Sequence, residues 1–124
     1  MSKILIVEDD TFISKMYEAK LIGLGYQAKV AENGEEALQK IKEWQPDLIL
    51  LDLILPILDG FEVLKKTKAD DNFNKIPIII LSNLDQKENI ERGIKLGADD
   101  YVMKARFTPS EVVEKIKKCL ASKN

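Results

Sequence analysis

The chain has 124 residues, with 21 acidic and 19 basic side chains, a net charge of −2, no histidine and one cysteine, Cys119. Its length suits one domain with its own hydrophobic core, and the near-balanced charge argues against direct binding of nucleic acid, which usually needs a clearly basic domain. Because the chain has no histidine, it cannot itself supply a Ser-His-Asp triad or a His-ligated metal site, and a single cysteine excludes a multi-Cys metal site and an intrachain disulfide. Its chemistry must therefore use carboxylates, hydroxyls, lysines or a hard metal ion.

The N-terminal segment predicts a strand and not a targeting signal. Residues 4–7 are apolar, but Glu8, Asp9 and Asp10 follow at once, so the run is too short for a signal peptide. No other apolar run approaches the ~18 residues of a membrane-spanning segment. We therefore expect a cytoplasmic protein that does not contact a membrane.

Short apolar runs alternate with amphipathic stretches along the whole chain. The predicted strands are residues 4–7, 27–31, 48–51, 78–81 and 101–103. The predicted helices are residues 11–24, 34–45, 60–69, 86–96 and 109–120, where apolar residues recur at helical spacing. Strands that are apolar on both faces and alternate with helices indicate an α/β fold, with a parallel sheet covered by helices on both sides.

Short motifs predict where the helices begin. Four segments carry an N-cap residue with a glutamate three positions later, as in a capping box: Asn33–Glu36, Asp59–Glu62, Asp85–Glu88 and Thr108–Glu111. Asp10 is expected to cap the first helix, and Gly25 and Gly97 fit helix ends. We see no linker between these elements, so we expect residues 1–124 to form a single domain.

Four of the predicted strands each end in polar groups that can do chemistry. Glu8 and Asp9 follow the first strand, and Asp52, Ser82 and Lys104 follow the third, fourth and fifth. In an open α/β sheet, ligands bind outside the carboxyl ends of the strands, where the strand order switches. If the first and third strands are neighbours there, three carboxylates share one cleft. Two carboxylates about 5 Å apart repel by roughly 3 kcal/mol at an effective dielectric of 20.

Three carboxylates in one cleft need a cation. Oxygen ligands without histidine or cysteine favour Mg²⁺, with Mn²⁺ as a possible substitute. Ser82 and Lys104 are suited to bind an oxyanion, as a hydroxyl donor and a compact cation. Asp52 is the natural candidate for a nucleophile that forms an aspartyl phosphate, because it stands alone at a strand end before the loop 53–58.

With these residues in place, the chain resembles the receiver domains of two-component response regulators, and it is similar to the single-domain chemotaxis regulators. Four motifs carry the resemblance in the family's order: ILIVEDD at 4–10, LILLDLILPILDG at 48–60, IIILS at 78–82 and GADDYVMK at 97–104. The resemblance covers essentially the whole chain. It implies a flavodoxin-like five-stranded parallel sheet with strand order 2-1-3-4-5 and helices on both faces.

The resemblance also implies how the switch works. Asp52 would accept a phosphoryl group from the phosphohistidine of a sensor kinase or phosphotransfer protein, and Ser82 and Lys104 would bind its oxygens. Ser82 would shift on activation, together with an inward rotation of Tyr101. The face made by the fourth helix, fifth strand and fifth helix would then signal to a downstream protein, or to an output domain outside this chain.

A metal site is implied by the same resemblance. Asp9 and Asp52 would ligate Mg²⁺ directly, Glu8 would do so through water, and the backbone carbonyl of Ile54 would be a further ligand. We expect no other cofactor, and either a monomer or a phosphorylation-dependent dimer.

Several positions depart from the family's pattern. Ala105 follows Lys104 where a proline, often with a cis bond, is usual; a cis bond before another residue costs about 3–4 kcal/mol, so this loop is either trans or strained. Asn83 replaces a common small alanine and narrows access to the site. Ile54 and Leu84 are apolar where polar groups can orient water, so we expect slow self-dephosphorylation.

Other functions stay open on the residues alone. A non-phosphorylated interaction module could keep the fold, although the complete set of strand-end residues argues against it. Haloacid-dehalogenase-type phosphatases also use a strand-end aspartate, but they need a second one at the position of Ile54. No glycine-rich loop supports a nucleotide-binding flavodoxin-like protein. We expect no enzymatic activity beyond phosphorylation and dephosphorylation of the chain itself.

Overall fold

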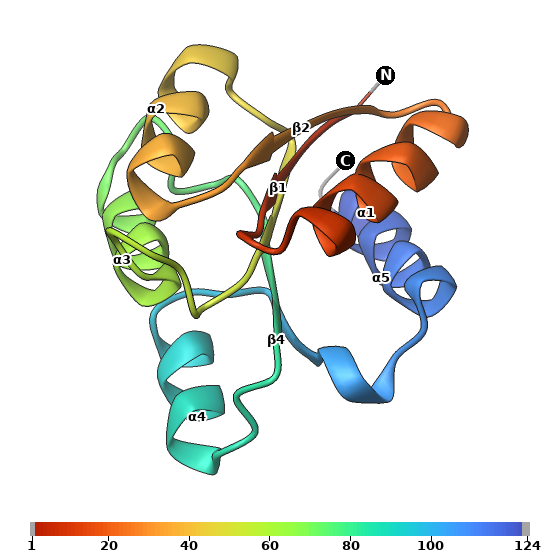
Figure 1. Ribbon diagram of the computed structural model, residues 1–124. Helices are drawn as coiled ribbons and strands as arrows, with labels where there is room; N and C mark the ends of the chain where they lie inside the picture. Colours follow the sequence, from red (N-terminus) through yellow and green to blue (C-terminus); the bar gives the residue numbers. More distant parts are fainter. Residues whose placement is uncertain (1, 123–124) are drawn as a thin grey trace.

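The computed structural model describes residues 2–122, and within this range five strands alternate with five α-helices (Figure 1). The strands are β1 (Lys3–Val7), β2 (Gln27–Ala31), β3 (Leu48–Leu51), β4 (Ile78–Ser82) and β5 (Asp100–Met103). The α-helices are α1 (Thr11–Gly23), α2 (Gly34–Trp44), α3 (Gly60–Ala69), α4 (Lys87–Lys95) and α5 (Pro109–Ser122), and a 3-10 helix, η1 (Lys104–Arg106), follows β5.

All five strands are parallel and lie in the order β2-β1-β3-β4-β5. This confirms the predicted fold class and strand order. The order reverses at β1, since the chain first adds β2 on one side of β1 and then places β3 on the other. Ligands bind at such a reversal in open α/β sheets, so the topology indicates the edge where β1 and β3 end.

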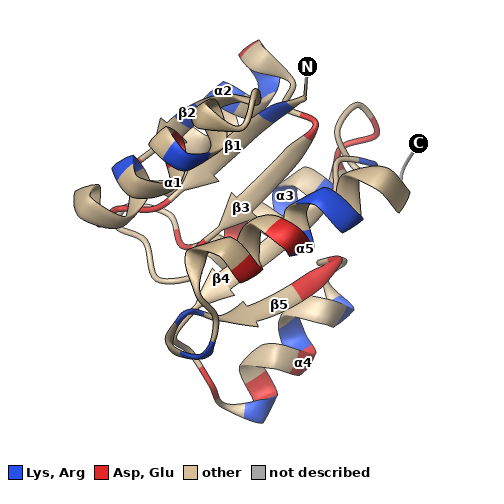
Figure 2. Ribbon diagram, turned by 90° about the vertical axis from the view of Figure 1, so that its right-hand side faces the viewer, with Lys and Arg blue, Asp and Glu red and all other residues tan. Residues whose placement is uncertain are grey.

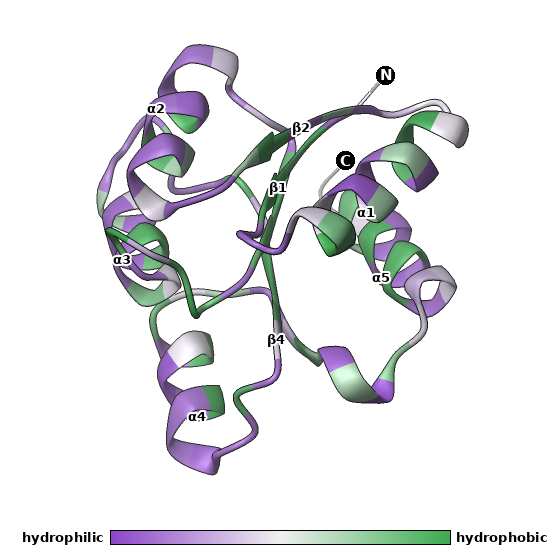
Figure 3. Cartoon of the chain, viewed as in Figure 1, coloured by the Kyte–Doolittle hydropathy of each residue, from purple (hydrophilic) through white to green (hydrophobic). Residues whose placement is uncertain are grey.

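The sheet separates two hydrophobic layers, because successive side chains of a strand point to opposite faces. Helices α2, α3 and α4 cover one face, and α1 and α5 cover the other (Figure 1). Leu5, Ile49 and Ile78 belong to the first layer, while Ile4 and Leu48 belong to the second. Hydrophobic residues concentrate on the central strands and on the helix sides that face them (Figure 3). None of the helices in residues 2–122 is long and apolar enough to cross a bilayer.

The helix starts test the capping predictions. Thr108 and Glu111 form the full reciprocal box, with each backbone N–H donating to the other's side chain at 2.9 and 3.2 Å. Asp10, Asn33 and Asp59 accept backbone N–H groups as N-caps.

The prediction at Asp85 is wrong. Helix α4 begins one residue later than that motif requires, and the residue before it, Gln86, makes no capping hydrogen bond with its side chain. Asp85 is exposed in the preceding loop. Only one residue of α4, Gly93, is buried, so the helix start is not fixed by packing either.

Candidate functional site

The ends of β1 and β3 bring the first polar residues together. Val7 pairs with Leu51 in the parallel register, so the next residues, Glu8 and Asp52, leave the sheet side by side. The backbone N–H of Asp52 donates to the carbonyl of Val7 at 3.0 Å. Glu8 and Asp52 are 3% and 7% exposed, whereas Asp9 is exposed.

Glu8, Asp9 and Asp52 form an acidic cluster in which one carboxylate oxygen from each residue lies within 4.8 Å of the others. This is the convergence that the sequence predicted. A donor set made only of oxygens, with one carboxylate open to solvent, fits a hard divalent cation. The backbone N–H of Ile54 lies 3.4 Å from Asp52 Oδ1, so this predicted metal-site residue also lies beside the carboxylate.

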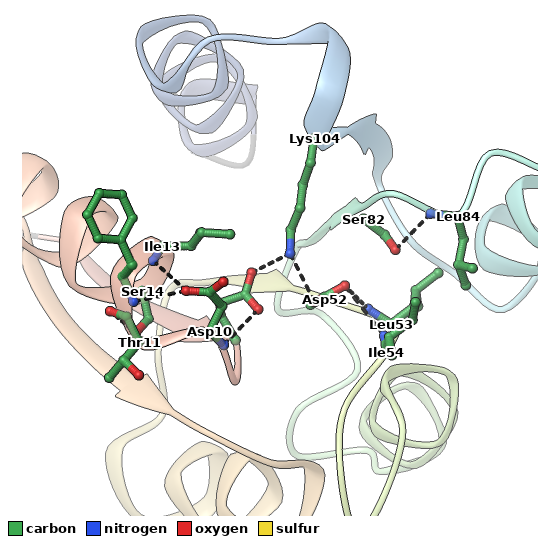
Figure 4. Close-up of polar contacts among 12 residues, drawn as sticks. Asp10, Thr11, Ile13, Ser14, Asp52, Leu53, Ile54, Ser82, Leu84 and Lys104 are labelled. Atoms are coloured by element: carbon green, nitrogen blue, oxygen red, sulfur yellow. Dashed lines mark hydrogen bonds and ion pairs between the residues drawn. The ribbon is translucent and has the colours of Figure 1, made fainter.

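Lys104, which directly follows the edge strand β5, also reaches the acidic cluster. Its Nζ lies 3.0 Å from Asp52 Oδ2 (Figure 4). The same Nζ also bonds to Glu8 Oε1. Burial disfavours the ammonium, but hydrogen bonds and charges from Glu8 and Asp52 outweigh burial and hold the pKa of Lys104 above its ordinary value. The bond to Glu8 was not predicted, because the two residues are 96 positions apart in the sequence.

Burial has the opposite effect on a carboxylate. It raises the pKa of Glu8 from 4.5 to about 7, against the hydrogen bond from Lys104, and the charge of Asp52 adds to the increase. The Asp10 N–H, 3.2 Å from Glu8 Oε2, lowers it slightly. Burial therefore moves the pKa of Glu8 toward neutral pH.

The loop after Asp52 is tightly built. Asp52 Oδ1 accepts the Leu53 N–H at 2.8 Å, and a Cβ at Gly60 would lie 2.2 Å from the Asp52 carbonyl oxygen, so only glycine fits there. Between them, the Leu58 N–H donates to the Pro56 carbonyl at 2.7 Å around Ile57, whose φ is +69°. This is a γ-turn with a positive φ, a strained conformation for a β-branched residue.

Ser82 and Tyr101 form the opposite wall. Ser82 is fully buried, and its Oγ accepts the Leu84 N–H at 3.3 Å (Figure 4). The Tyr101 hydroxyl donates to the carbonyl of the same Leu84 at 2.6 Å, and its ring packs against the core. Burial raises the pKa of Tyr101, whereas the nearby Ser82 hydroxyl lowers it, so the two predicted switch residues are neighbours.

The departures from the family pattern can now be located. No peptide bond in residues 2–122 is cis, so the bond between Lys104 and Ala105 is trans, and both residues continue into η1. Asn83 is exposed at the edge of the site, and Leu84 is half-buried. Ile54 is 58% exposed.

Tyr17 is a polar residue of this region that the sequence did not single out. It is 4% exposed on α1 and lines a small cavity together with Glu8 and Asp52. Burial raises the pKa of Tyr17, and the charges of Lys104 and Glu8 act on it in opposite directions. Its place in the helical spacing of residues 11–24 indicates a core residue, and the hydroxyl group on the inner face of the helix is the further signal in the sequence.

Known proteins are similar to this chain in sequence and in fold. The model of the response regulator receiver domain matches residues 4–117. A probable transcriptional regulator, ycf27, of Guillardia theta is 38% identical over 122 residues, covering 98% of this chain and 46% of that protein. The DNA-binding response regulator MtrA of Mycolicibacterium smegmatis is 37% identical over 115 residues, covering 93% and 49%. The chain thus spans about half the length of these curated relatives.

Solved structures match over the whole domain. The receiver domain of the Francisella response regulator 1452 is 35% identical, with a TM-score of 0.91 and full coverage of both chains. A CheY-like receiver domain protein of Methanospirillum hungatei JF-1 is 32% identical, with a TM-score of 0.92, covering 99% of this chain and 96% of that one. The sequence match and the shared fold agree: this chain belongs to the response regulator receiver domain family.

Proposed function

We propose that the chain is a phosphorylation-activated switch whose phosphoacceptor is Asp52. The observation that carries the proposal is the position of its carboxylate, held between two backbone N–H groups on one oxygen and the Lys104 ammonium on the other. The donor is the phosphohistidine of a sensor kinase or a histidine phosphotransfer protein, because this chain has no histidine of its own.

The transfer forms one bond and breaks another. A carboxylate oxygen of Asp52 attacks phosphorus, the bond between phosphorus and the donor imidazole breaks, and the imidazole nitrogen takes a proton. Lys104 already bonds to Asp52 and then pairs with the negative charge of the phosphoryl group. The Ser82 hydroxyl turns away from the Leu84 N–H and donates to a phosphoryl oxygen. Glu8, Asp9, Asp52 and the Ile54 carbonyl would hold Mg²⁺, or Mn²⁺ in its place, which supplies charge neutralisation for the phosphoryl oxygens.

The signal leaves the site through Tyr101. The backbone of Leu84 bonds to both residues: its N–H donates to Ser82 Oγ, and its carbonyl accepts from the Tyr101 hydroxyl. Movement of the Ser82 segment therefore changes the position of the Tyr101 ring, which lies beside Gly93 of α4. We propose that the α4-β5-α5 face, which carries charges of both signs including the pair Lys115–Asp100 at 3.3 Å, presents the result to a protein partner or to an output domain outside this chain (Figure 2). Catalysis is limited to the chain's own phosphorylation and dephosphorylation.

One experiment tests this function. The protein is incubated with Mg²⁺ and acetyl phosphate, and intact mass spectrometry follows the addition of one phosphoryl group. We expect the parent and Asp59→Asn to be modified and Asp52→Asn to remain unmodified. Asp59→Asn is a matched control because asparagine also caps helices well. An unmodified parent, or a modified Asp52→Asn, contradicts the proposal.

A further inference from the structure

Tyr17 is a buried tyrosine that the proposed phosphoryl transfer does not use. It lies on the inner side of α1, and it is 4% exposed among the apolar residues of the α1 and α5 layer. It also lines a cavity of about 10 Å³ whose wall includes Glu8 and Asp52. Its side chain therefore reaches from the helix to the inner side of the acidic cluster.

The hydroxyl of Tyr17 has an unusual environment for a core tyrosine. Within residues 2–122, no other residue hydrogen-bonds to it, although buried tyrosine hydroxyls usually have a partner. Every completely buried side-chain oxygen in this range does have a partner. The Tyr17 hydroxyl is therefore not sealed off, and a water-sized molecule can touch it.

The cavity has the size that one water molecule needs, and within its mostly apolar wall the lining residues Glu8, Asp52 and Tyr17 carry polar groups. A volume near 10 Å³ corresponds to about one water-sized sphere, and a bound water requires two to four polar partners. The carboxylates of Glu8 and Asp52 offer acceptors, and the Tyr17 hydroxyl offers a donor and an acceptor.

We propose that Tyr17 is a positioning residue of the acidic cluster: its hydroxyl, through one water molecule in this cavity, hydrogen-bonds to the carboxylates of Glu8 and Asp52 from their inner side. Lys104 and the Asp10 N–H each bond to one oxygen of the Glu8 carboxylate, and each oxygen has a second lone pair that can accept from the water. When Lys104 turns toward a phosphoryl group, the contact from Tyr17 keeps Glu8 aligned with the cation. This inference rests on the proposed function, because it assigns Tyr17 a part in holding the proposed cation.

The substitution Tyr17→Phe isolates the hydroxyl, because the ring and its packing remain. We expect this variant of the full chain to bind Mg²⁺ ~3- to 10-fold more weakly than the parent, the loss of one hydrogen bond. The midpoint of thermal unfolding should not fall. Addition of Mg²⁺ should perturb the near-ultraviolet tyrosine absorption of the parent, and this signal should vanish in Tyr17→Phe. Tyr26→Phe is the matched control, because Tyr26 directly precedes β2 and therefore lies at the amino ends of the parallel strands, whereas the acidic cluster lies at their carboxyl ends.

Each outcome decides the matter. An unchanged Mg²⁺ affinity in Tyr17→Phe, or an equal loss in Tyr26→Phe, overturns the positioning role and leaves Tyr17 as a core residue. A high-resolution crystal structure with no water density between Tyr17 and Glu8 also overturns it. A parent that does not bind Mg²⁺ overturns both this inference and the proposed metal site. A parent that binds Mg²⁺ and is phosphorylated while Tyr17→Phe behaves identically overturns this inference alone.

Discussion

Lys104 Nζ lies 3.0 Å from Asp52 Oδ2, and both side chains are largely buried. The same ammonium bonds to Glu8, so one cation balances two carboxylates at the place where a metal ion would also bind. We therefore expect Lys104 and a divalent cation to compete for the same carboxylates, which can be tested by removing the side-chain cation.

Substitution of Lys104 by glutamine should lower stability and raise metal affinity. Without the ammonium, the buried carboxylates repel each other, and we expect a loss of about 1–3 kcal/mol at pH 8 in the absence of metal. Mg²⁺ should bind more tightly than in the parent and restore part of the stability. Urea unfolding with and without Mg²⁺ measures both effects.

Lys115→Gln is the control for this variant. Lys115 pairs with Asp100, but these side chains are 33% and 42% exposed, so its removal should change stability by no more than about 0.5 kcal/mol. Equal losses in the two variants would contradict the special role of the Lys104 bridge.

Glu8 should make stability depend on pH in metal-free buffer. Its pKa is raised from 4.5 in the unfolded chain to about 7 in the folded protein, so the folded state holds this proton more tightly. Protonated Glu8 therefore adds about 3 kcal/mol to the free energy of unfolding. This contribution is complete below pH 4.5 and is lost as the pH rises through 7. Mg²⁺ competes with the same proton, so its affinity should rise with pH up to about 7.

Glu8→Gln removes this proton. The difference in unfolding free energy between parent and Glu8→Gln should therefore change across the interval from pH 5 to 8, measured by urea titration at each pH. A constant difference over this interval would show that Glu8 does not titrate there.

The γ-turn at Ile57 predicts a stabilising substitution. Ile57 is 73% exposed, so little packing is lost when its side chain is removed, and glycine adopts a φ of +69° without strain. We expect Ile57→Gly to raise the free energy of unfolding by up to about 1 kcal/mol, because relief of strain exceeds the added entropy of the unfolded chain. Ile54→Gly, at an exposed residue without positive φ, should destabilise. A destabilised Ile57→Gly would mean that the turn is not strained.

Gly93 should control the position of the Tyr101 ring. A Cβ at this residue would lie 2.6 Å from Ile80 Cδ1 and 3.3 Å from Tyr101 Cδ2, so Gly93→Ala must displace a neighbour. We expect the hydrogen bond from Tyr101 to Leu84 to weaken and the Tyr101 ring resonances to shift in NMR spectra. Gly23→Ala is the control, since its Cβ would meet nothing within 4 Å. That variant should gain up to about 1 kcal/mol from helix propensity and leave Tyr101 unchanged.

The exposed side chain of Ile54 should prolong the phosphorylated state. An apolar group beside Asp52 cannot orient a water molecule for attack on the acyl phosphate, whereas an amide can. We expect a slow loss of the phosphoryl group from the purified parent and a faster loss from Ile54→Asn, followed by intact mass over time. A half-life of seconds in the parent would contradict this prediction.

The fold was largely predictable because its strands are covered on both faces. The runs 4–7, 48–51 and 78–81 are continuous and apolar, and such runs between amphipathic helices leave few arrangements. Their order came from the family resemblance, since the pairing of β1 with β3 depends on how the helices between them pack. The end of each strand then located Glu8, Asp52 and Lys104 at one edge.

What could not be predicted depends on side-chain positions after folding. The direct bond between Lys104 and Glu8 and the approach of Tyr17 join residues that no local pattern connects. The start of α4 was misplaced at Asp85, because a capping motif alone does not fix a helix that buries little of its surface.

Helix α4 buries little of its surface against the domain, and this lowers the free energy needed to move it. Of its nine residues only Gly93 is buried, and its start has no side-chain cap. We expect such a segment to rearrange at a free energy well below that of global unfolding. The proposed phosphorylation of Asp52 would then need to supply only this smaller free energy to move α4, and the rest of the domain would keep its packing.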